Sequence, residues 1–429
     1  MSESNDVPEI THLRDLTSQQ WKTGTAAILG WLFDGLDMHL YTLVAIPFVA
    51  ELLGVGRSDP SVGRYSSIIQ AAFLVGWALG GAFFGVIADR IGRSRALILT
   101  ILTYACFTGL SFFAQAWWHL LIFRFLAALG IGGEWAVGAS LLSETWPRRW
   151  RPGLAAVLQS GVNIGVILAC VAAYLLSEQP HRTVFLVGIL PAFLVMWIRK
   201  AVPEPKEWHH AQEHSEPRSM GIAALFQPSV RRTTLLTMTV CALALTGHWA
   251  IMFWCISHLR SLPEYAGWTD AERSVLASQA LLLVMCMSIV GNFLSAIIAR
   301  RIGYRLAIVL MFLAYFFASS WAYGWERSGD NLWYWLVPIG ICQGVFALFT
   351  MYLPPLFPTL IRSTGAGFCY NIGRLAAAVG TVFFGIVSKV GDYRYALFYA
   401  GFLFLPAAAV AWFLEEPPDE LTPLAQRRS

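Results

Sequence analysis

The sequence predicts an all-α integral membrane protein in which twelve transmembrane helices form two six-helix bundles. Of its 429 residues, 57% are hydrophobic and 13% are charged, and a soluble protein of this size has too small an interior to bury so many apolar side chains. Apolar runs of about 20 residues, the length that crosses a bilayer as a helix, recur along the whole chain. The chain also repeats itself, because Asp89-Arg90-Ile91-Gly92 corresponds to Arg300-Arg301-Ile302-Gly303 at an offset of 211 residues, from 89 to 300.

The expected spans follow one another along the whole chain. In the first half, the apolar runs predict spans at residues 21–53, 64–88, 96–115, 117–142, 153–176 and 183–202. In the second half they predict spans at 233–259, 275–298, 306–325, 332–356, 363–388 and 395–414. The expected organisation is therefore a tail at 1–20, an N-terminal bundle at 21–202, a polar linker at 203–230, a C-terminal bundle at 231–414 and a tail at 415–429.

The basic residues predict the orientation in the membrane. With an even number of spans both termini lie on one side, and the loops and tails of that side hold about two thirds of the 30 lysines and arginines. Because positively charged loops stay in the cytoplasm, both termini are expected there, in the cell (inner or plasma) membrane. The first 20 residues have no basic n-region, so they are expected to be a cytoplasmic tail and not a signal peptide. A monomer surrounded by the lipid bilayer is expected, without nucleic acid as a partner.

A charged stretch, GVIADRIGRSR at residues 85–95, lies between the second and third apolar runs. So many charged side chains cannot lie in hydrocarbon, so the stretch is expected to form a tight turn. Its pattern G-x-x-x-D-R-x-G-R-x-R resembles the signature loop of the major facilitator superfamily, between the second and third transmembrane helices. The resemblance implies two bundles around a central cavity that opens alternately to the two sides of the membrane.

A gate on the cytoplasmic side is expected around this turn. The pattern E-x-x-P-x-x-x-R-x-G at residues 144–153 resembles the end of the fourth helix in sugar and metabolite porters, and it implies an ion-pair lock between Glu144 and Arg93. Contact of this basic turn with lipid headgroups is a compatible alternative. In the second copy Arg300 replaces Asp89 and Pro355 replaces Glu144, so the halves are expected to gate unequally. The expected gate residues are Asp89, Arg90, Arg93, Glu144, Arg151 and Arg362.

Asp34 and Asp37 lie three residues apart on one face of the first span. Charges in hydrocarbon are costly, and like charges this close do not both ionise readily, so the pair is expected to take up and release a proton. A structural ion pair with another helix is the alternative. The pattern D-G-x-D resembles the first helix of the aromatic acid:proton symporters. Arg124, in a stretch that resembles the fourth-helix motif of the superfamily, is expected at the same height and within reach of the pair, and Glu134 is a second candidate for protonation.

Polar residues inside other spans predict the substrate site. Arg374 is expected near the midplane of the second half, whose spans contain no acidic residue, so a substrate anion or a carboxylate across the interface is expected to pair with it. Protonation of the first-helix pair would leave Arg124 for a substrate carboxylate, whose two oxygens match the guanidinium donors. The expected substrate-binding residues are Arg124, Gln159, Asn163, His248, Trp249, Asn371 and Arg374. Gln159 matches a cavity-facing glutamine of sugar porters, and hydrogen bonds between helices are the alternative for the neutral amides.

These features predict a secondary active transporter, and not an enzyme, that takes up a small organic acid with a proton by alternating access. Symport of a sugar or another neutral metabolite and export by proton antiport stay open, although the fifth span lacks the proline-glycine motif of drug:proton antiporters. A non-transporting nutrient sensor on the same fold is a more remote alternative. The expected partners are a small-molecule substrate and the proton. No cofactor beyond the proton gradient and no metal site is expected, because the seven cysteines are scattered and form no C-x-x-C.

Overall fold

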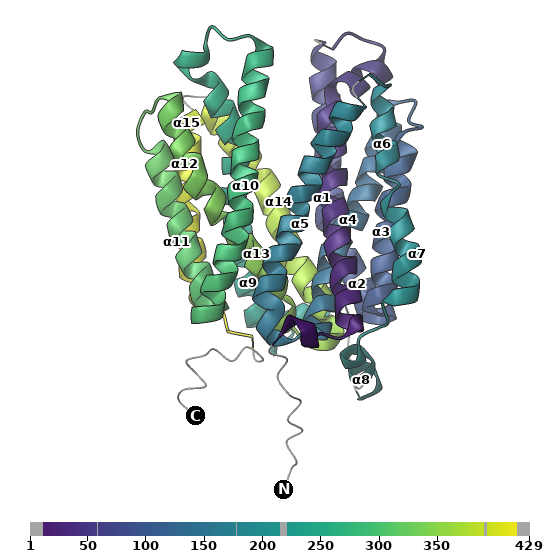
Figure 1. Cartoon of the computed structure of the whole chain (residues 1–429). Coiled ribbons are helices and arrows are strands. Elements are labelled where there is room, and N and C mark those ends of the chain that lie inside the picture. The colour runs from purple at the N-terminus through teal and green to yellow at the C-terminus, as the bar shows by residue number, and fades with distance from the viewer. Residues whose placement is uncertain (1–11, 58, 177, 215–220, 390–392, 418–429) are drawn as a thin grey trace.

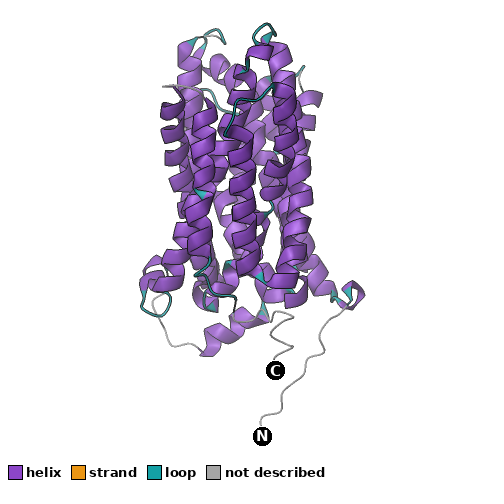
Figure 2. Ribbon diagram, turned by 90° about the vertical axis from the view of Figure 1, so that its left-hand side faces the viewer, coloured by secondary structure: helices purple, strands orange, loops and turns teal. Residues whose placement is uncertain are grey.

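The computed structural model describes residues 12–57, 59–176, 178–214, 221–389 and 393–417. Within these ranges the chain forms helices and connecting loops and contains no strand (Figure 2). The helices form two bundles side by side, one from each half of the chain, and the first and last described segments, at residues 12 and 417, lie at the same end of the molecule (Figure 1). This arrangement is the expected pair of membrane-spanning bundles.

The N-terminal half has five long helices and a sixth crossing that is divided in two. The helices are α1 (Ser18–Leu53), α2 (Pro60–Ile91), α3 (Arg93–Ser111), α4 (Trp117–Thr145), α5 (Arg151–Leu175), α6 (Val184–Val187) and α7 (Pro191–Ala201). The predicted sixth span is therefore present, but it is interrupted. Its break precedes Pro191, which has no amide hydrogen to donate to the helix ladder.

The C-terminal half repeats this pattern with two divided crossings. Its helices are α9 (Arg231–Ser261), α10 (Asp270–Ile302), α11 (Tyr304–Tyr323), α12 (Gly329–Cys342), α13 (Val345–Tyr352), α14 (Arg362–Lys389), α15 (Tyr393–Phe402) and α16 (Phe404–Ala411). The predicted tenth and twelfth spans are thus also interrupted. The break between α12 and α13 places Gln343 at the cavity described below.

Eleven crossings in the described ranges are long and apolar enough to span a membrane. The remaining crossing is α14, a helix of 28 residues that carries Arg374 and packs against α2 and α9. The chain is therefore a multi-pass membrane protein. The linker contains a further short helix, α8 (Lys206–His214), which lies at the same end of the molecule as the two chain ends (Figure 1).

Polar residues cap several helices where the chain enters them. Thr17 accepts a hydrogen bond from the Gln20 amide at the start of α1, and Thr269 does the same for Glu272 at the start of α10. Asp59 caps α2 by accepting a hydrogen bond from the Ser61 amide at 2.8 Å, and its hydrogen bonds to Ser61 lower the pKa of the Asp59 carboxyl. These caps explain why α1, α2 and α10 begin a few residues before the apolar runs that predict them.

The sequence repeat is also a repeat in space. Gly92 and Gly303 occupy equivalent turns with φ of 105° and 87°, a backbone conformation that side-chain-bearing residues rarely adopt. After each turn a glutamate from the end of the same half accepts hydrogen bonds from two backbone amides of the following helix. Glu204 does so at the start of α3 and Glu416 at the start of α11. Burial raises the pKa of the Glu416 carboxyl.

Candidate functional site

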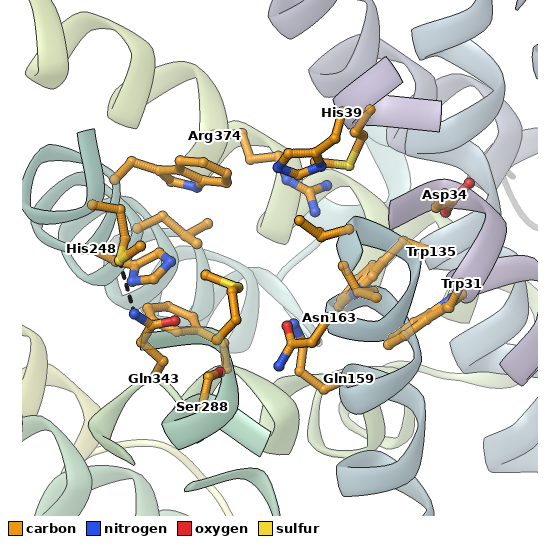
Figure 3. A pocket seen from close by; sticks show the side chains of 18 of the residues that line it. Trp31, Asp34, His39, Trp135, Gln159, Asn163, His248, Ser288, Gln343 and Arg374 are labelled. Carbon is orange, nitrogen blue, oxygen red and sulfur yellow. Dashed lines mark hydrogen bonds between the residues drawn. The ribbon is translucent and has the colours of Figure 1, made fainter. Parts of the chain in front are cut away.

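A cavity of about 260 Å³ lies between the two halves (Figure 3). The N-terminal half contributes residues from α1, α2, α4 and α5, and the C-terminal half contributes residues from α9, α10, α13 and α14 as well as Gln343. The lining is mostly aromatic and aliphatic, with a few polar side chains, which is the usual character of a small-molecule site. The polar and charged lining residues are Asp34, His39, Gln159, Asn163, His248, Ser288, Gln343 and Arg374.

Arg374 is the cationic group of this cavity. Its guanidinium carbon lies 3.8 Å from the ring centroid of Trp77 in the other half and 4.7 Å from that of Tyr370. Its Nη1 donates a hydrogen bond to the Asn371 side-chain oxygen at 2.5 Å. Among the described residues no carboxylate forms an ion pair with it. The aromatic faces hold the guanidinium in place by cation–π attraction, and no carboxylate of the described residues contacts it directly.

A row of stacked aromatic rings links the two halves beside Arg374. Trp135 of α4 stacks on Tyr370 of α14 with ring centroids 4.2 Å apart and planes 11° apart. Trp31 of α1 also stacks on Trp135, with ring centroids 6.3 Å apart. Figure 3 shows Trp31 and Trp135 on the same side of the cavity as Asp34. Because Trp135 and Tyr370 belong to different halves, this stack must separate if the halves move apart here.

The expected contact between Arg124 and the first-helix carboxylates is present, and it is made by Asp37. Nη1 and Nη2 of Arg124 lie 3.3 and 3.2 Å from the two oxygens of Asp37, and Nη1 also donates to the Thr108 hydroxyl at 3.2 Å. The ring of Phe73 lies 4.8 Å from the guanidinium carbon. Both members of the pair are fully buried, and neither lines the cavity. Nη1 and Nη2 of Arg124 thus point to Asp37 and Thr108 in this structure, and its role in substrate binding stays a prediction.

Asp34 takes a different position from Asp37. It lines the cavity, and its carboxyl lies next to that of Glu134, which is fully buried in α4. The Glu134 carboxyl occupies the space left by Gly30, where any side chain would collide with it. Among the described residues, both oxygens of Glu134 are buried without a hydrogen-bond partner. One oxygen of Asp34, Oδ1, is buried without a partner as well. The two acidic residues thus form a pair without a cation bound directly to it.

Neutral polar side chains complete the cavity. The Nδ1 atom of His248 lies 3.1 Å from the Tyr315 hydroxyl, and the Gln343 amide lies 2.8 Å from the sulfur of Met252. Gln159 and Asn163 line the opposite wall in Figure 3, and the Asn163 amide nitrogen is buried with no acceptor among the described residues. Trp249 also lines the cavity as expected. Asn371 does not line it, and instead orients Arg374.

At the end of the molecule that carries both chain ends, Asp89 joins the two halves. Its carboxylate accepts hydrogen bonds from the backbone amides of Ser363 and Thr364 at 3.1 and 2.9 Å and from the Thr364 hydroxyl at 2.6 Å. These amides are in the first turn of α14, where no intrahelical acceptor is available. A carboxylate there also compensates the partial positive charge of the helix end. Asp89 therefore binds α2 to α14 across the interface.

Three more charged side chains extend this contact into a network. Arg93 lies 3.1 Å from Asp89 and 2.8 Å from Glu144, all three side chains being at most 1% exposed. Arg362 of the C-terminal half lies 3.2 Å from the same Glu144 oxygen. We refer to Asp89, Arg93, Glu144 and Arg362 as the gate cluster. The contact between Arg93 and Glu144 that the sequence pattern implies is thus present, and Arg362 adds a bond from the other half.

The linker helix α8 lies against the gate cluster. Its Trp208 donates a hydrogen bond from the indole nitrogen to the Asp89 carbonyl at 3.1 Å, and its Glu207 lies 2.8 Å from Arg362. Arg90 and Arg151 are the remaining residues that the sequence places in the gate. Arg90 is exposed, and its side chain forms no ion pair among the described residues. Arg151 donates to the Trp146 carbonyl at 3.3 Å and so closes its own turn.

Sequence reasoning missed most of the aromatic and neutral lining of the cavity. Trp77, Trp135 and Tyr370 are surrounded by other apolar residues in the sequence, where a lining residue and a core residue give the same pattern. Gln343 follows an apolar run and carries no motif, and only the break between α12 and α13 turns it toward the cavity. The only feature of the sequence that could have indicated Gln343 is that it is a polar residue within a predicted span.

Comparisons with known proteins agree with this architecture. A family model described as the Major Facilitator Superfamily matches residues 27–362. The chain is 31% identical over 391 residues to a probable 4-methylmuconolactone transporter of Cupriavidus pinatubonensis, a match that covers 86% of this chain and 84% of the relative. It is 27% identical to the cis,cis-muconate transport protein of Acinetobacter baylyi over 87% of this chain and 89% of the relative. It is also 27% identical to a gentisate transporter of Corynebacterium glutamicum over 84% of this chain and 80% of the relative.

Among solved structures, the proton:xylose symporter XylE has a TM-score of 0.74 and covers 96% of this chain and 99% of its own. The sequence identity is 15%, so the similarity shows the fold alone.

Proposed function

The chain belongs to the Major Facilitator Superfamily, and we propose that as a member of it this protein takes up a small organic acid together with a proton by alternating access. Transport, and not catalysis, is the activity for which its relatives are named. The finer proposal, an acid as substrate and a proton as the coupled ion, rests on the chemistry of the cavity.

The observation that carries the proposal is Arg374, a guanidinium group in the cavity between the halves that no carboxylate of the described residues contacts directly. A cation held away from bulk water without a carboxylate is costly, so an anionic ligand is stabilised beside it. A carboxylate suits this position because its two oxygens match the donors of a guanidinium group. The rings of Trp77, Trp135 and Tyr370 provide flat apolar surface next to Arg374 for an unsaturated or ring-bearing body.

The relatives support the same substrate class. Two of them are named for the transport of muconate and gentisate, which are an unsaturated and an aromatic carboxylate. Proton coupling is supported by the acidic residues Asp34 and Glu134, because ionisable groups inside membrane spans mark ion pathways and proton relays.

The gate cluster supports a transport cycle in which the halves separate alternately at the two ends. We propose that the end with both chain ends faces the cytoplasm, because its loops carry most of the basic residues. The structure then corresponds to a state with the cytoplasmic side closed by the gate cluster. Opening that side requires the breaking of the bonds that Asp89 and Arg362 make across the interface.

Symport of a neutral metabolite with a proton is the second candidate. It is favoured by the amide side chains of Gln159 and Asn163, which line the cavity and suit hydroxyl groups. Arg374, which no carboxylate of the described residues contacts directly, favours the acid instead.

Uptake by proteoliposomes distinguishes these functions. The purified protein is reconstituted, and radiolabelled cis,cis-muconate, gentisate and xylose are each supplied outside, with and without a pH gradient that is acid outside. We expect one of the acids to accumulate when the gradient is present and to leak out when a protonophore collapses it. Accumulation of xylose alone would establish the neutral-metabolite function, and acid uptake that merely equilibrates, whether or not the gradient is present, would exclude proton coupling.

A further inference from the structure

Asp34, Asp37 and Glu134 are in two different chemical situations. Asp37 receives Nη1 and Nη2 of Arg124 on its two carboxylate oxygens and a further bond from Nη2 on its backbone carbonyl. An ion pair with this many hydrogen bonds is stable as a pair of charges even when buried. Asp37 and Arg124 thus pair their charges with each other inside the N-terminal half.

Asp34 and Glu134 have no such partner. Their carboxyl groups lie next to each other, and no lysine, arginine or histidine forms an ion pair with either among the described residues. Two adjacent carboxylates in a buried site repel each other strongly. A carboxylate has no hydrogen to donate, so the two groups can satisfy each other only when one proton lies between them. The geometry therefore requires that the pair hold a proton.

We propose that Asp34 and Glu134 form a shared-proton pair that serves as the proton-binding site of the transporter, while the Asp37–Arg124 ion pair stays charged and holds α1 against α4. The inference rests on the proposed function, and it assigns the proton to one particular pair of residues. With one proton the pair carries a single negative charge, and with two protons it is neutral. Gly30 is a positioning residue, because its missing side chain provides the space for the Glu134 carboxyl.

The placement of the pair connects it to the substrate site. Asp34 lines the cavity, so the second proton enters and leaves through Asp34, whereas Glu134 is fully buried behind it. The charged and titratable groups around the pair are Asp37 on α1, Tyr104 on α3 and Arg374 on α14, with His39 also on the cavity wall. When the pair is neutral, Arg374 loses the attraction of the nearby Asp34 charge and keeps its own positive charge for the substrate carboxylate.

Infrared difference spectroscopy of the purified, substrate-free protein tests the shared proton directly. A protonated carboxyl group gives a C=O stretching band that is separate from those of carboxylates and that shifts in D₂O. The double variant Asp34→Asn/Glu134→Gln preserves the shape of both side chains and removes the proton site. We expect the wild-type minus variant spectrum at neutral pH to contain this band. The control variant Asp37→Asn/Arg124→Gln should still show the C=O band in its own spectrum, because this variant leaves Asp34 and Glu134 in place.

The outcomes separate this inference from the proposed function. A band that persists in the Asp34→Asn/Glu134→Gln protein, or that disappears in the Asp37→Asn/Arg124→Gln control, would overturn the assignment of the proton. The spectra need no substrate, so they decide the assignment even if neither cis,cis-muconate nor gentisate is transported, a result that would count against the proposed function alone. If one acid is transported, Glu134→Gln should abolish its pH-driven accumulation and keep acid-for-acid exchange.

Discussion

Removal of the Asp89 carboxylate tests how the gate cluster holds the two halves together. In the Asp89→Ala variant the amides of Ser363 and Thr364 and the Thr364 hydroxyl lose an acceptor at 3.1, 2.9 and 2.6 Å. A hydrogen bond to a charged group contributes roughly 1.5–3 kcal/mol. These three share one acceptor and are not additive, so we expect the closed state to lose about 3 kcal/mol relative to the state open at this end, which is on the order of a 100-fold shift in the equilibrium.

Hydrogen–deuterium exchange at the start of α14 measures this shift. In the wild type the Ser363 and Thr364 amides are buried and bonded to Asp89, so they exchange only when the two halves separate. Asp89→Ala should accelerate their exchange by about 100-fold, up to the limit set by unprotected amides. Transport at saturating substrate should slow more than substrate binding weakens, because the variant returns less readily to the state shown here.

The repeat provides a matched control for this experiment. Arg300 occupies the position of Asp89 in the second half, where it donates to the Arg149 carbonyl at 3.2 Å and lies 5.3 Å from the centre of the Trp150 ring. Arg300 is exposed, so Arg300→Ala should change the exchange of the α14 amides little. Equal exchange rates in Asp89→Ala and the wild type, or an equal acceleration by Arg300→Ala, would refute the role given to Asp89.

Three further changes probe the cavity and its support. Arg374→Lys keeps the charge but loses the paired guanidinium donors and part of the cation–π attraction. The Kd for the transported acid should therefore rise by about tenfold. An unchanged Kd would show that Arg374 does not bind the substrate. Gly30→Ala places a methyl group against the neighbouring carboxyl and should cost about 1–3 kcal/mol of stability, seen as a lower Tm, whereas Gly63→Ala meets open space and should not lower it. Trp135→Ala removes the stack with Tyr370. Spin-label distance measurements should then show more molecules in which the two halves are separated at the end with the gate cluster. An unchanged distance distribution would argue against the stack as a contact between halves.

The sequence was informative wherever a charged residue or a turn is incompatible with the hydrocarbon core of the membrane. Asp34, Arg124 and Arg374 could be singled out because ionisable groups inside apolar runs are rare and costly. The expected contact between Arg124 and a first-helix carboxylate followed from the rise of 1.5 Å per residue along two helices. The pairing of Arg93 with Glu144, by contrast, was available only from a resemblance, and the structure provides the distances.

Which of two similar residues makes a given contact was not available from the sequence. Asp34 and Asp37 lie on one face of α1, and the rotation of that helix decides that Asp37 meets Arg124 while Asp34 meets Glu134 and the cavity. The same holds for Arg124 and Arg374, which are equally unusual in the sequence. Arg124 forms an ion pair with Asp37 within its own half, and Arg374 lies at the interface without a carboxylate in direct contact among the described residues.

By itself, the sequence determined that the chain crosses the membrane repeatedly in two related halves, where the turns lie, and which ionisable groups had to have a special role. These properties depend on hydropathy and on local backbone chemistry, which act over one helix at a time. Only the tertiary structure decided that Trp77, Tyr370 and Trp135 surround Arg374, and that Asp89 caps the first turn of a helix in the opposite half. Contacts between helices far apart in the chain depend on the rotation and depth of each helix, and an apolar run leaves both undetermined because every face of it suits lipid and protein alike.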